Sequence, residues 1–460
     1  MAKRRGRRQL WLLLAVFVYA LLVGSGIAPN PLPAVWGWLT QERPLAPDLT
    51  WQDRLGSRPA AAAAAGDALA VDAGTSTQLR RRSSGVVIAP GSEEEELPAS
   101  WVVVAGGPDD ALVIISPRDG EGYEVRDPGT GAVLHTEERA VAVWGYRDAW
   151  LDLQCGDGRA CQLRYHRLGQ AGVGQPVWTT DLPGERSGML GAHPELAGPR
   201  GAAPNRIHSR VSGPEPVPPL LGLTTTRRGA DLVVVVRTSD GKILQELEQA
   251  RGERIMVVGD RVVRSTMQRH GGVCVSSVTG YEAISGAPVW GPQPYHLWTT
   301  DDVGCEQREP PLSDGTAMAA VRPDGLPIVV DGYDGRVLWT GELDERVEDL
   351  SPELAVIRAA DRTTRYAVRL GGDGEREWER TADPDAGVAL AGCGVVVADR
   401  NPDRVYVWDP ATGDTRLTRA TSARVLACAP DGVVIADGRS IGFAPFDGAP
   451  APPGQIPEPK

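Results

Sequence analysis

Phenylalanine, lysine and helical periodicity are all scarce in this chain of 460 residues. Phenylalanine occurs three times, and lysine occurs only at Lys3, Lys242 and Lys460. No segment after residue 28 combines a sustained helical spacing of apolar residues with capping residues at its ends. The chain is nevertheless 42% hydrophobic, with 55 glycines and 38 prolines. This composition excludes a helical protein and indicates many short strands joined by turns.

Acidic residues outnumber basic residues, and the formal net charge is −12. Five of the 48 basic residues lie within the first eight positions, which leaves 43 basic against 60 acidic residues in the rest of the chain. Proteins bind phosphate backbones by neutralising them with lysine and arginine, so this charge argues against a nucleic-acid partner. The one basic run beyond the N-terminus, Arg80–Arg82, is interpreted as a solvated loop.

The N-terminal region is predicted to be a membrane anchor followed by a stalk. Residues 1–9 form a basic cytoplasmic tail, and residues 10–28 form an apolar, charge-free segment of 19 residues, which is long enough to span a bilayer as a single helix. Because positive flanks stay in the cytoplasm, the stalk over residues 29–47 and everything after it are placed outside the cell membrane. A signal peptide cleaved after Ala28 is the alternative.

The cysteine content suits an extracytoplasmic protein. Six cysteines lie beyond the predicted anchor, and no two have the Cys-x-x-Cys spacing. An even number in an oxidising compartment indicates three disulfides, and the scattered histidines argue against zinc. We predict sequential pairing of Cys155, Cys161, Cys274, Cys305, Cys393 and Cys428.

A turn of the type Asp-Gly or Thr-Gly recurs along the chain, each copy followed by a short strand with a large apolar residue. The turn glycines are separated by 43, 67, 45, 49, 39 and 39 residues, and they are Gly131, Gly174, Gly241, Gly286, Gly335, Gly374 and Gly413. Spacings of roughly 40–50 residues are typical of four-stranded propeller blades. The longest spacing contains an insertion within residues 183–219, rich in glycine, proline and alanine.

The turn chemistry explains the recurring residues. Glycine supplies the positive φ that a tight hairpin needs, and the tryptophan that follows lies on the outermost strand of a blade. There a large side chain can pack between neighbouring blades, so we interpret Trp178, Trp290, Trp339 and Trp378 as packing residues rather than ligand platforms. The alanine run at 60–65 is interpreted as a linker.

Two copies of the repeat, Val329–Trp339 and Val405–Leu417, resemble the units of quinoprotein-like (PQQ-type) β-propellers. The resemblance covers residues 48–447 and implies an all-β propeller of four-stranded blades, preceded by the one transmembrane helix. Eight blades are favoured and seven are the alternative. In the eight-bladed arrangement, the strand around Trp51 completes the last blade and closes the ring, which removes exposed strand edges. Residues 448–460 are predicted to be a disordered tail.

No pattern in the sequence predicts a catalytic residue, a cofactor-binding residue or a metal ligand. The resemblance would imply a quinone and a calcium ion for an active dehydrogenase, but the adjacent cysteines of that family are absent. The match Gly438-Arg439-Ser440-Ile441-Gly442 lies in a predicted hairpin and not in the strand-to-helix turn of a nucleophile elbow. The basic middle of the insertion, with Arg200, Arg206, His208 and Arg210, is a candidate contact for an anionic partner or cell-wall polymer, and a disordered segment is the alternative.

The sequence therefore predicts a single-pass, membrane-anchored, extracytoplasmic propeller that acts as a non-enzymatic interaction, scaffold or sensor module without a cofactor. Its partner is expected to be a protein or another component of the cell envelope. The alternative is an enzyme, either a quinone-dependent dehydrogenase or a carbohydrate-active propeller. A convergent pocket with carboxylates would favour the enzyme, and a charged or apolar face would favour the interaction module.

Overall fold

The computed structural model describes residues 44–448, with gaps at 74–75, 89–96, 99, 108–109, 118–120, 157–160, 170–172, 190–213, 251 and 298–311. The named strands all lie within the unit that begins at Leu45. The predicted anchor at 10–28 and the predicted tail after residue 448 lie outside the described residues. Within the described part, no helix has the length and apolar character needed to cross a membrane.

Antiparallel pairing groups the strands into nine sheets, numbered here as blades 1–9. Blade 1 consists of β2 (Ala61–Ala65), β3 (Ala68–Asp72), β4 (Ser76–Arg81) and β5 (Leu97–Pro98). Blade 2 consists of β6 (Ser100–Ala105), β7 (Leu112–Pro117), β8 (Tyr123–Arg126) and β9 (Val133–Glu137). Blade 3 consists of β10 (Ala140–Gly145), β11 (Ala149–Cys155), β12 (Cys161–Arg167) and β13 (Trp178–Leu182). Blade 4 consists of β14 (Glu185–Met189), β15 (Leu220–Arg227), β16 (Ala230–Arg237) and β17 (Ile243–Glu248). Blade 5 consists of β18 (Glu253–Val258), β19 (Arg261–His270), β20 (Val273–Glu282) and β21 (Pro288–Gln293). Blade 6 consists of β22 (His296–Leu297), β23 (Ser313–Asp314), β24 (Ala317–Val321), β25 (Pro327–Asp331) and β26 (Val337–Thr340). Blade 7 consists of β27 (Arg346–Leu350), β28 (Leu354–Arg358), β29 (Thr364–Arg369) and β30 (Arg376–Thr381). Blade 8 consists of β31 (Gly387–Ala391), β32 (Gly394–Arg400), β33 (Asp403–Trp408) and β34 (Thr415–Ala420). Blade 9 consists of β35 (Arg424–Ala429), β36 (Gly432–Asp437), β37 (Ser440–Pro445) and β1 (Trp51–Arg54).

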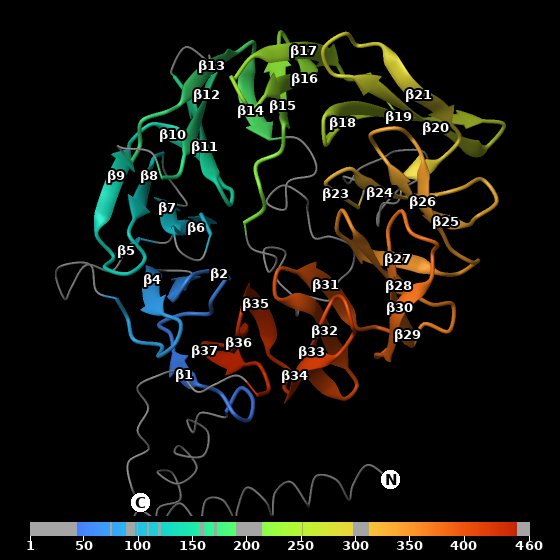
Figure 1. Ribbon diagram of the computed structural model, residues 1–460. Helices are drawn as coiled ribbons and strands as arrows, with labels where there is room; N and C mark the ends of the chain where they lie inside the picture. Colours follow the sequence, from blue (N-terminus) through green and yellow to red (C-terminus); the bar gives the residue numbers. More distant parts are fainter. Residues whose placement is uncertain are drawn as a thin grey trace, which may run out of the picture. The chain divides into compact units, whose positions relative to one another are not determined.

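The blades follow one another around a common centre, as Figure 1 shows, with β2, β6, β27, β31 and β35 toward that centre. The predicted all-β propeller is therefore confirmed. Eight of the nine described sheets have the predicted four strands, and the sheet of blade 6 has five. The predicted number of eight blades is wrong, because the described residues form nine sheets.

The additional blade is blade 1, which begins with the alanine run. Residues 61–65 pair with β3 over their whole length, from Ala61 opposite Asp72 to Ala65 opposite Ala68. The interpretation of this run as a linker is wrong. Alanine has a low strand propensity, but its small side chain suits an inner strand that lies close to β35 of blade 9 and β6 of blade 2. The tight turn of blade 1 is centred on Gly85, whose positive φ of 71° matches that of the other turns.

The predicted closure of the ring by the strand around Trp51 is confirmed. Strand β1 pairs with β37, with Trp51 opposite Phe443 and Arg54 opposite Ser440. Arg80 of blade 1 is 3% exposed and donates a hydrogen bond to Asp53 of β1 at 2.6 Å. The interpretation of Arg80–Arg82 as a solvated loop is therefore wrong, since Arg80 belongs to β4 and ties blade 1 to blade 9.

Tryptophans dock one blade onto the next at four interfaces. In each, the indole Nε1 donates a hydrogen bond of 2.6–2.9 Å to a carbonyl in the turn of the following blade. The pairs are Trp51 with Arg82, Trp178 with Thr238, Trp290 with Gly332 and Trp378 with Pro410. A Cβ on the turn glycine would come within 2.6 or 2.7 Å of the indole at Gly85, Gly241, Gly335 and Gly413. The structure thus confirms that Trp178, Trp290 and Trp378 are packing residues.

The apolar core consists of separate clusters between consecutive blades. One cluster joins blades 3 and 4 through residues such as Leu153 and Leu223, and another joins blades 8 and 9 through residues such as Val396 and Val433. Each blade therefore buries both of its faces against its neighbours, as expected for radial repetition.

Candidate functional site

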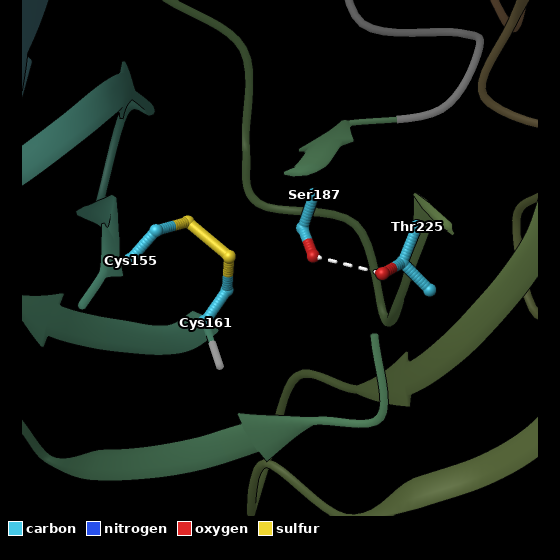
Figure 2. Close-up of a disulfide and its surroundings, with 4 residues drawn as sticks. All are labelled: Cys155, Cys161, Ser187 and Thr225. Carbon is cyan, nitrogen blue, oxygen red and sulfur yellow. Dashed lines mark hydrogen bonds between the residues drawn. A yellow bond between two sulfur atoms is a disulfide. The ribbon is translucent and has the colours of Figure 1, made fainter. Parts of the chain in front are cut away.

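Two of the predicted disulfides lie among the described residues. Cys155 and Cys161 join the ends of β11 and β12, with their Cα atoms 4.1 Å apart. Figure 2 shows this disulfide near β14 of the next blade, where Ser187 donates a hydrogen bond to Thr225 at 3.2 Å. The Cys155–Cys161 bridge clamps a hairpin, as predicted.

The second disulfide, between Cys393 and Cys428, links blade 8 to blade 9 with Cα atoms 5.7 Å apart. Cys274 is also disulfide-bonded, whereas Cys305 lies outside the described residues. The candidate insertion is described only at its ends, so Arg200, Arg206, His208 and Arg210 lie outside the described residues as well. The Gly438–Gly442 match falls in the β36–β37 hairpin, where Asp437 pairs with Ser440, and the structure confirms that it is not a nucleophile elbow.

A row of arginines lies on blade 7. Strand register places Arg346 opposite Arg358, and Arg358 opposite Arg365. Residues directly opposite one another share a face of the sheet, where like charges are destabilising. A β-bulge between Val347 and Asp349 brings Glu348 into this row of arginines. We call Arg346, Arg358, Arg362, Arg365 and Glu348 the arginine cluster.

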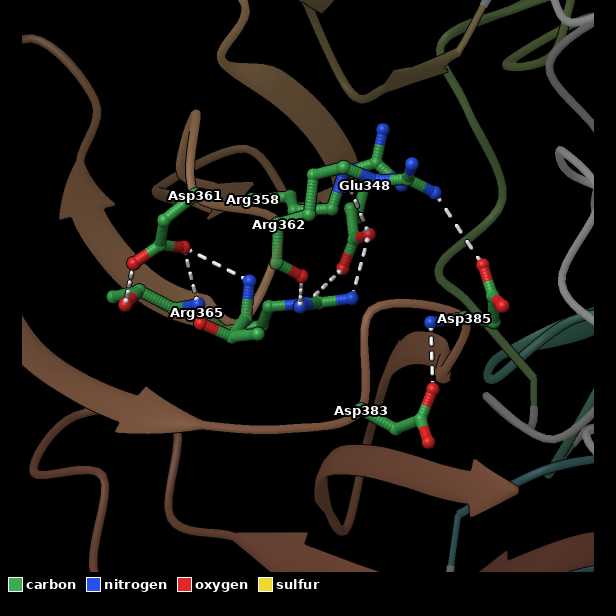
Figure 3. Close-up of polar contacts among 9 residues, drawn as sticks. Glu348, Arg358, Asp361, Arg362, Arg365, Asp383 and Asp385 are labelled. Carbon is green, nitrogen blue, oxygen red and sulfur yellow. Dashed lines mark hydrogen bonds and ion pairs between the residues drawn. The ribbon is translucent and has the colours of Figure 1, made fainter. Parts of the chain in front are cut away.

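Arg365 holds the only carboxylate of the arginine cluster. Its side chain is fully buried, and it donates hydrogen bonds to the two oxygens of Glu348 at 3.0 and 3.4 Å. Its third nitrogen donates to the backbone carbonyl of Arg362 at 2.5 Å. Figure 3 shows these contacts, together with the ion pair of 3.4 Å from Arg362 to Asp385. Arg365 is therefore a positioning residue with its donors occupied.

Arg358 has donors to spare. Its Nε lies 3.8 Å from Glu348, beyond hydrogen-bond distance, and this buried nitrogen has no hydrogen-bond partner among the described residues. The Arg358 side chain is 20% exposed, and that of Arg362 is 60% exposed. Arg362 also has a φ of 66°, a left-handed conformation that costs a non-glycine residue about 1–3 kcal/mol.

Burial affects the charges of the arginine cluster in opposite directions. Burial raises the pKa of Glu348, although Arg365, Arg358 and Arg346 act to lower it. Burial, followed by the neighbouring Arg358, lowers the pKa of Arg346. Both pKa shifts disfavour the charged form of the side chain. The ion pairs of the cluster therefore do not fully offset the cost of burying these charges, in a chain whose net charge is negative.

A second buried polar group joins blades 2 and 3. Asp152 of β11 is fully buried, and its Oδ2 accepts a hydrogen bond from Tyr123 of β8 at 2.9 Å. The same oxygen lies 2.7 Å from Nε2 of His166 on β12. The Trp150 ring stacks on His166 with ring centroids 4.7 Å apart, and its Nε1 donates to the Tyr123 hydroxyl at 3.2 Å. We call Tyr123, His135, Trp150, Asp152 and His166 the histidine cluster.

A cavity of about 400 Å³ lies between blades 1 and 2 and is lined by residues that include Asp67, Asp110 and Asp127. Its volume is in the range of small-molecule pockets. Its carboxylates, however, already accept hydrogen bonds within the local turns: Asp67 from Ser83, and Asp127 from Thr130. The Thr130 hydroxyl bond lowers the pKa of Asp127. These aspartates act as turn-forming residues.

No group of three histidine, cysteine, aspartate or glutamate side chains in the described part of the chain is arranged to hold a metal ion. The sequence interpretation missed both polar clusters. Arg346, Arg358 and Arg365 lie on three consecutive strands, and only the strand register shows that they form one row. One signal was present in the sequence: His135 follows Gly131 at the same distance as Trp178 follows Gly174.

No protein-family model matches the chain, and no protein of curated function matches it. Solved structures of low sequence identity do match. A eukaryotic initiation factor has a TM-score of 0.46 at 11% identity, covering 80% of this chain and 88% of that one. BamB from Moraxella catarrhalis has a TM-score of 0.36 at 11% identity, covering 81% and 98%. The dihydro-heme d1 dehydrogenase NirN has a TM-score of 0.37 at 15% identity, covering 86% and 84%.

Proposed function

We propose that this protein is a non-enzymatic interaction module of the cell envelope, anchored in the cell membrane by residues 10–28 with its propeller outside. The arginine cluster carries the proposal. Arg358 and Arg362 are partly exposed, and they belong to a group in which three guanidiniums, those of Arg358, Arg362 and Arg365, contact two carboxylates, Glu348 and Asp385. Disulfides are typical of an oxidising compartment, which supports the extracytoplasmic location.

The partner that fits this cluster is an acidic protein surface. A guanidinium presents a planar fork of donors that matches a carboxylate, and Arg358 Nε has no acceptor among the described residues. The excess of positive charge would also raise the rate of encounter with an acidic partner.

The experiment is affinity purification of the full-length chain from crosslinked membranes, with quantitative mass spectrometry of the captured proteins. We expect one acidic partner to be enriched with the wild type and to fall about tenfold or more in the Arg358→Gln, Arg362→Gln double variant. The matched control is Arg322→Gln, which removes an arginine of similar exposure paired with Asp324 at 2.9 Å. Equal capture by the wild type and the double variant would contradict the proposed contact.

The enzyme alternative has a separate test. Quinone and calcium binding to the purified full-length chain is measured by equilibrium dialysis, and we expect none. Saturable binding of a quinone in the presence of calcium would replace the interaction module with a dehydrogenase.

A further inference from the structure

His135 takes the place of a docking tryptophan between blades 2 and 3. It lies on β9 and faces Gly174, the turn glycine of blade 3, where a Cβ would come within 2.2 Å of the imidazole. Trp178, Trp290 and Trp378 face their turn glycines in the same way. Unlike those indoles, which each donate to a carbonyl, His135 has an Nε2 that is buried without a hydrogen-bond partner in the described residues.

Other polar atoms of the histidine cluster also lack hydrogen-bond partners among the described residues. Eight buried side-chain polar atoms have no partner within the described part of the chain, and three of them are His135 Nε2, Asp152 Oδ1 and His166 Nδ1. Buried polar atoms normally find a partner, so this concentration at one blade interface marks a place that structural packing alone does not explain. The tilted contact of 6.1 Å between the Tyr123 and His135 rings connects the two parts.

No guanidinium contacts Asp152 in the described structure, and its polar neighbours are a hydroxyl and an imidazole. Arg164, which the strand register places opposite Asp152, is instead paired with Glu137 at 3.1 Å. The titratable and charged groups around His135 are thus Tyr123 of β8, Glu137 of β9, Asp152 of β11, and Arg164 and His166 of β12.

We propose that the interface between blades 2 and 3 is a pH-sensitive latch, closed in neutral medium and released when mildly acidic medium protonates His135. A protonated imidazole carries a second N–H, and in the closed interface that donor has no acceptor. Protonation of His135 also places a positive charge near His166, whose Nε2 faces Asp152. Solvent offers the missing acceptors, so protonation favours withdrawal of β9 from the turn of blade 3. The indole-docked interfaces have no titrating group at this position.

The direction of the pH effect follows from the burial of His135. Burial, followed by the proximity of His166, lowers the pKa of His135 below its ordinary value of 6.5. The unfolded chain therefore takes up a proton that the closed interface resists. The stability contributed by the closed interface is complete above about pH 6.5 and is lost progressively as the pH falls toward the lowered value.

The latch is tested by hydrogen exchange with mass spectrometry on the full-length chain at pH 7.5 and pH 5.0, after correction for the intrinsic rates. We expect protection of the β9 amides to fall about tenfold or more at pH 5.0, whereas β21, which carries the docked Trp290, keeps its protection. His135→Trp should abolish the pH effect. Gln245→Trp is the matched control, since Gln245 faces Gly286 as His135 faces Gly174 and donates to the Ala283 carbonyl at 2.7 Å; it should leave the effect unchanged.

His135→Gln provides a second variant in case the larger indole does not fit. Glutamine cannot titrate and already serves at the equivalent position of blade 4, so it should also remove the pH effect. Protection of β9 that does not change with pH in the wild type would overturn the latch. A pH effect that persists in both His135 variants would overturn it as well.

Discussion

The arginine cluster of blade 7 and the histidine cluster of blades 2 and 3 both contain a buried carboxylate, yet they surround it with different partners. Glu348 is held by Arg365, a group that stays charged at every physiological pH. Asp152 is held by Tyr123 and His166, and the same cluster contains His135, whose pKa is lowered by burial. The first arrangement is permanent and leaves cationic donors for a partner. The second arrangement responds to pH.

The two clusters also respond to acid with opposite signs. Because burial raises the pKa of Glu348, proton uptake on acidification favours the folded state there. The pKa of His135 is lowered, so acidification below about pH 6.5 favours the unfolded state at the other cluster. A propeller with both clusters should therefore lose stability in mild acid at the blade 2 and blade 3 interface, and not at blade 7.

Breaking the arginine cluster should give the largest effect. Arg365→Met leaves the buried Glu348 without its main partner, so we expect a loss of about 3–5 kcal/mol in the free energy of unfolding, measured by urea titration at pH 7.5. The control is Arg369→Met on the same strand, whose side chain is 58% exposed and pairs with Glu377; its loss should stay below about 1 kcal/mol. Similar losses in the two variants would show that Glu348 does not depend on Arg365.

Removing an indole gives a reference value for an interface with no buried charge. Trp290 is 8% exposed and packs between blades 5 and 6, so Trp290→Ala should cost about 3–4 kcal/mol. The same urea titration at pH 7.5 and pH 5.0 should give equal losses, because the indole that docks this interface does not titrate. A loss that depends on pH would mean that pH sensitivity is not confined to the histidine cluster.

Neutralising Asp152 should have a smaller effect. Asp152→Asn keeps an oxygen that can accept from Tyr123 but removes the charge facing His166, so we expect a loss of about 1–3 kcal/mol at pH 7.5. The loss is measured by urea titration. An unchanged free energy of unfolding would mean that the Asp152 carboxylate does not stabilise the histidine cluster.

The sequence predicted the propeller well because its turns repeat. Glycine at a positive φ and an indole four residues later, as at Gly335 and Trp339, follow from local geometry that every copy must satisfy. The closing strand at Trp51 and the Cys155–Cys161 clamp were predictable for the same reason. The alanine strand β2 was not, since alanine carries no strand signal, and its pairing depends on the surrounding blades.

The candidate sites were hidden from sequence reasoning because they depend on strand register and on which face a residue occupies. Nothing local distinguishes Arg358 from the other arginines of the chain. Only the pairing of β27, β28 and β29 shows that it stands between two more guanidiniums. His135 was visible as a histidine near a turn, but its role required knowing that Gly174 lies against its ring.

The pH dependence of unfolding tests most directly whether the histidine cluster makes this propeller sensitive to acid. The free energy of unfolding is measured by urea titration between pH 7.5 and pH 5.0 for the wild type and for His135→Trp. We predict that the wild type loses stability as the pH falls below about 6.5, and that the difference between the two proteins grows steadily over that range. Parallel curves for the two proteins would contradict this explanation.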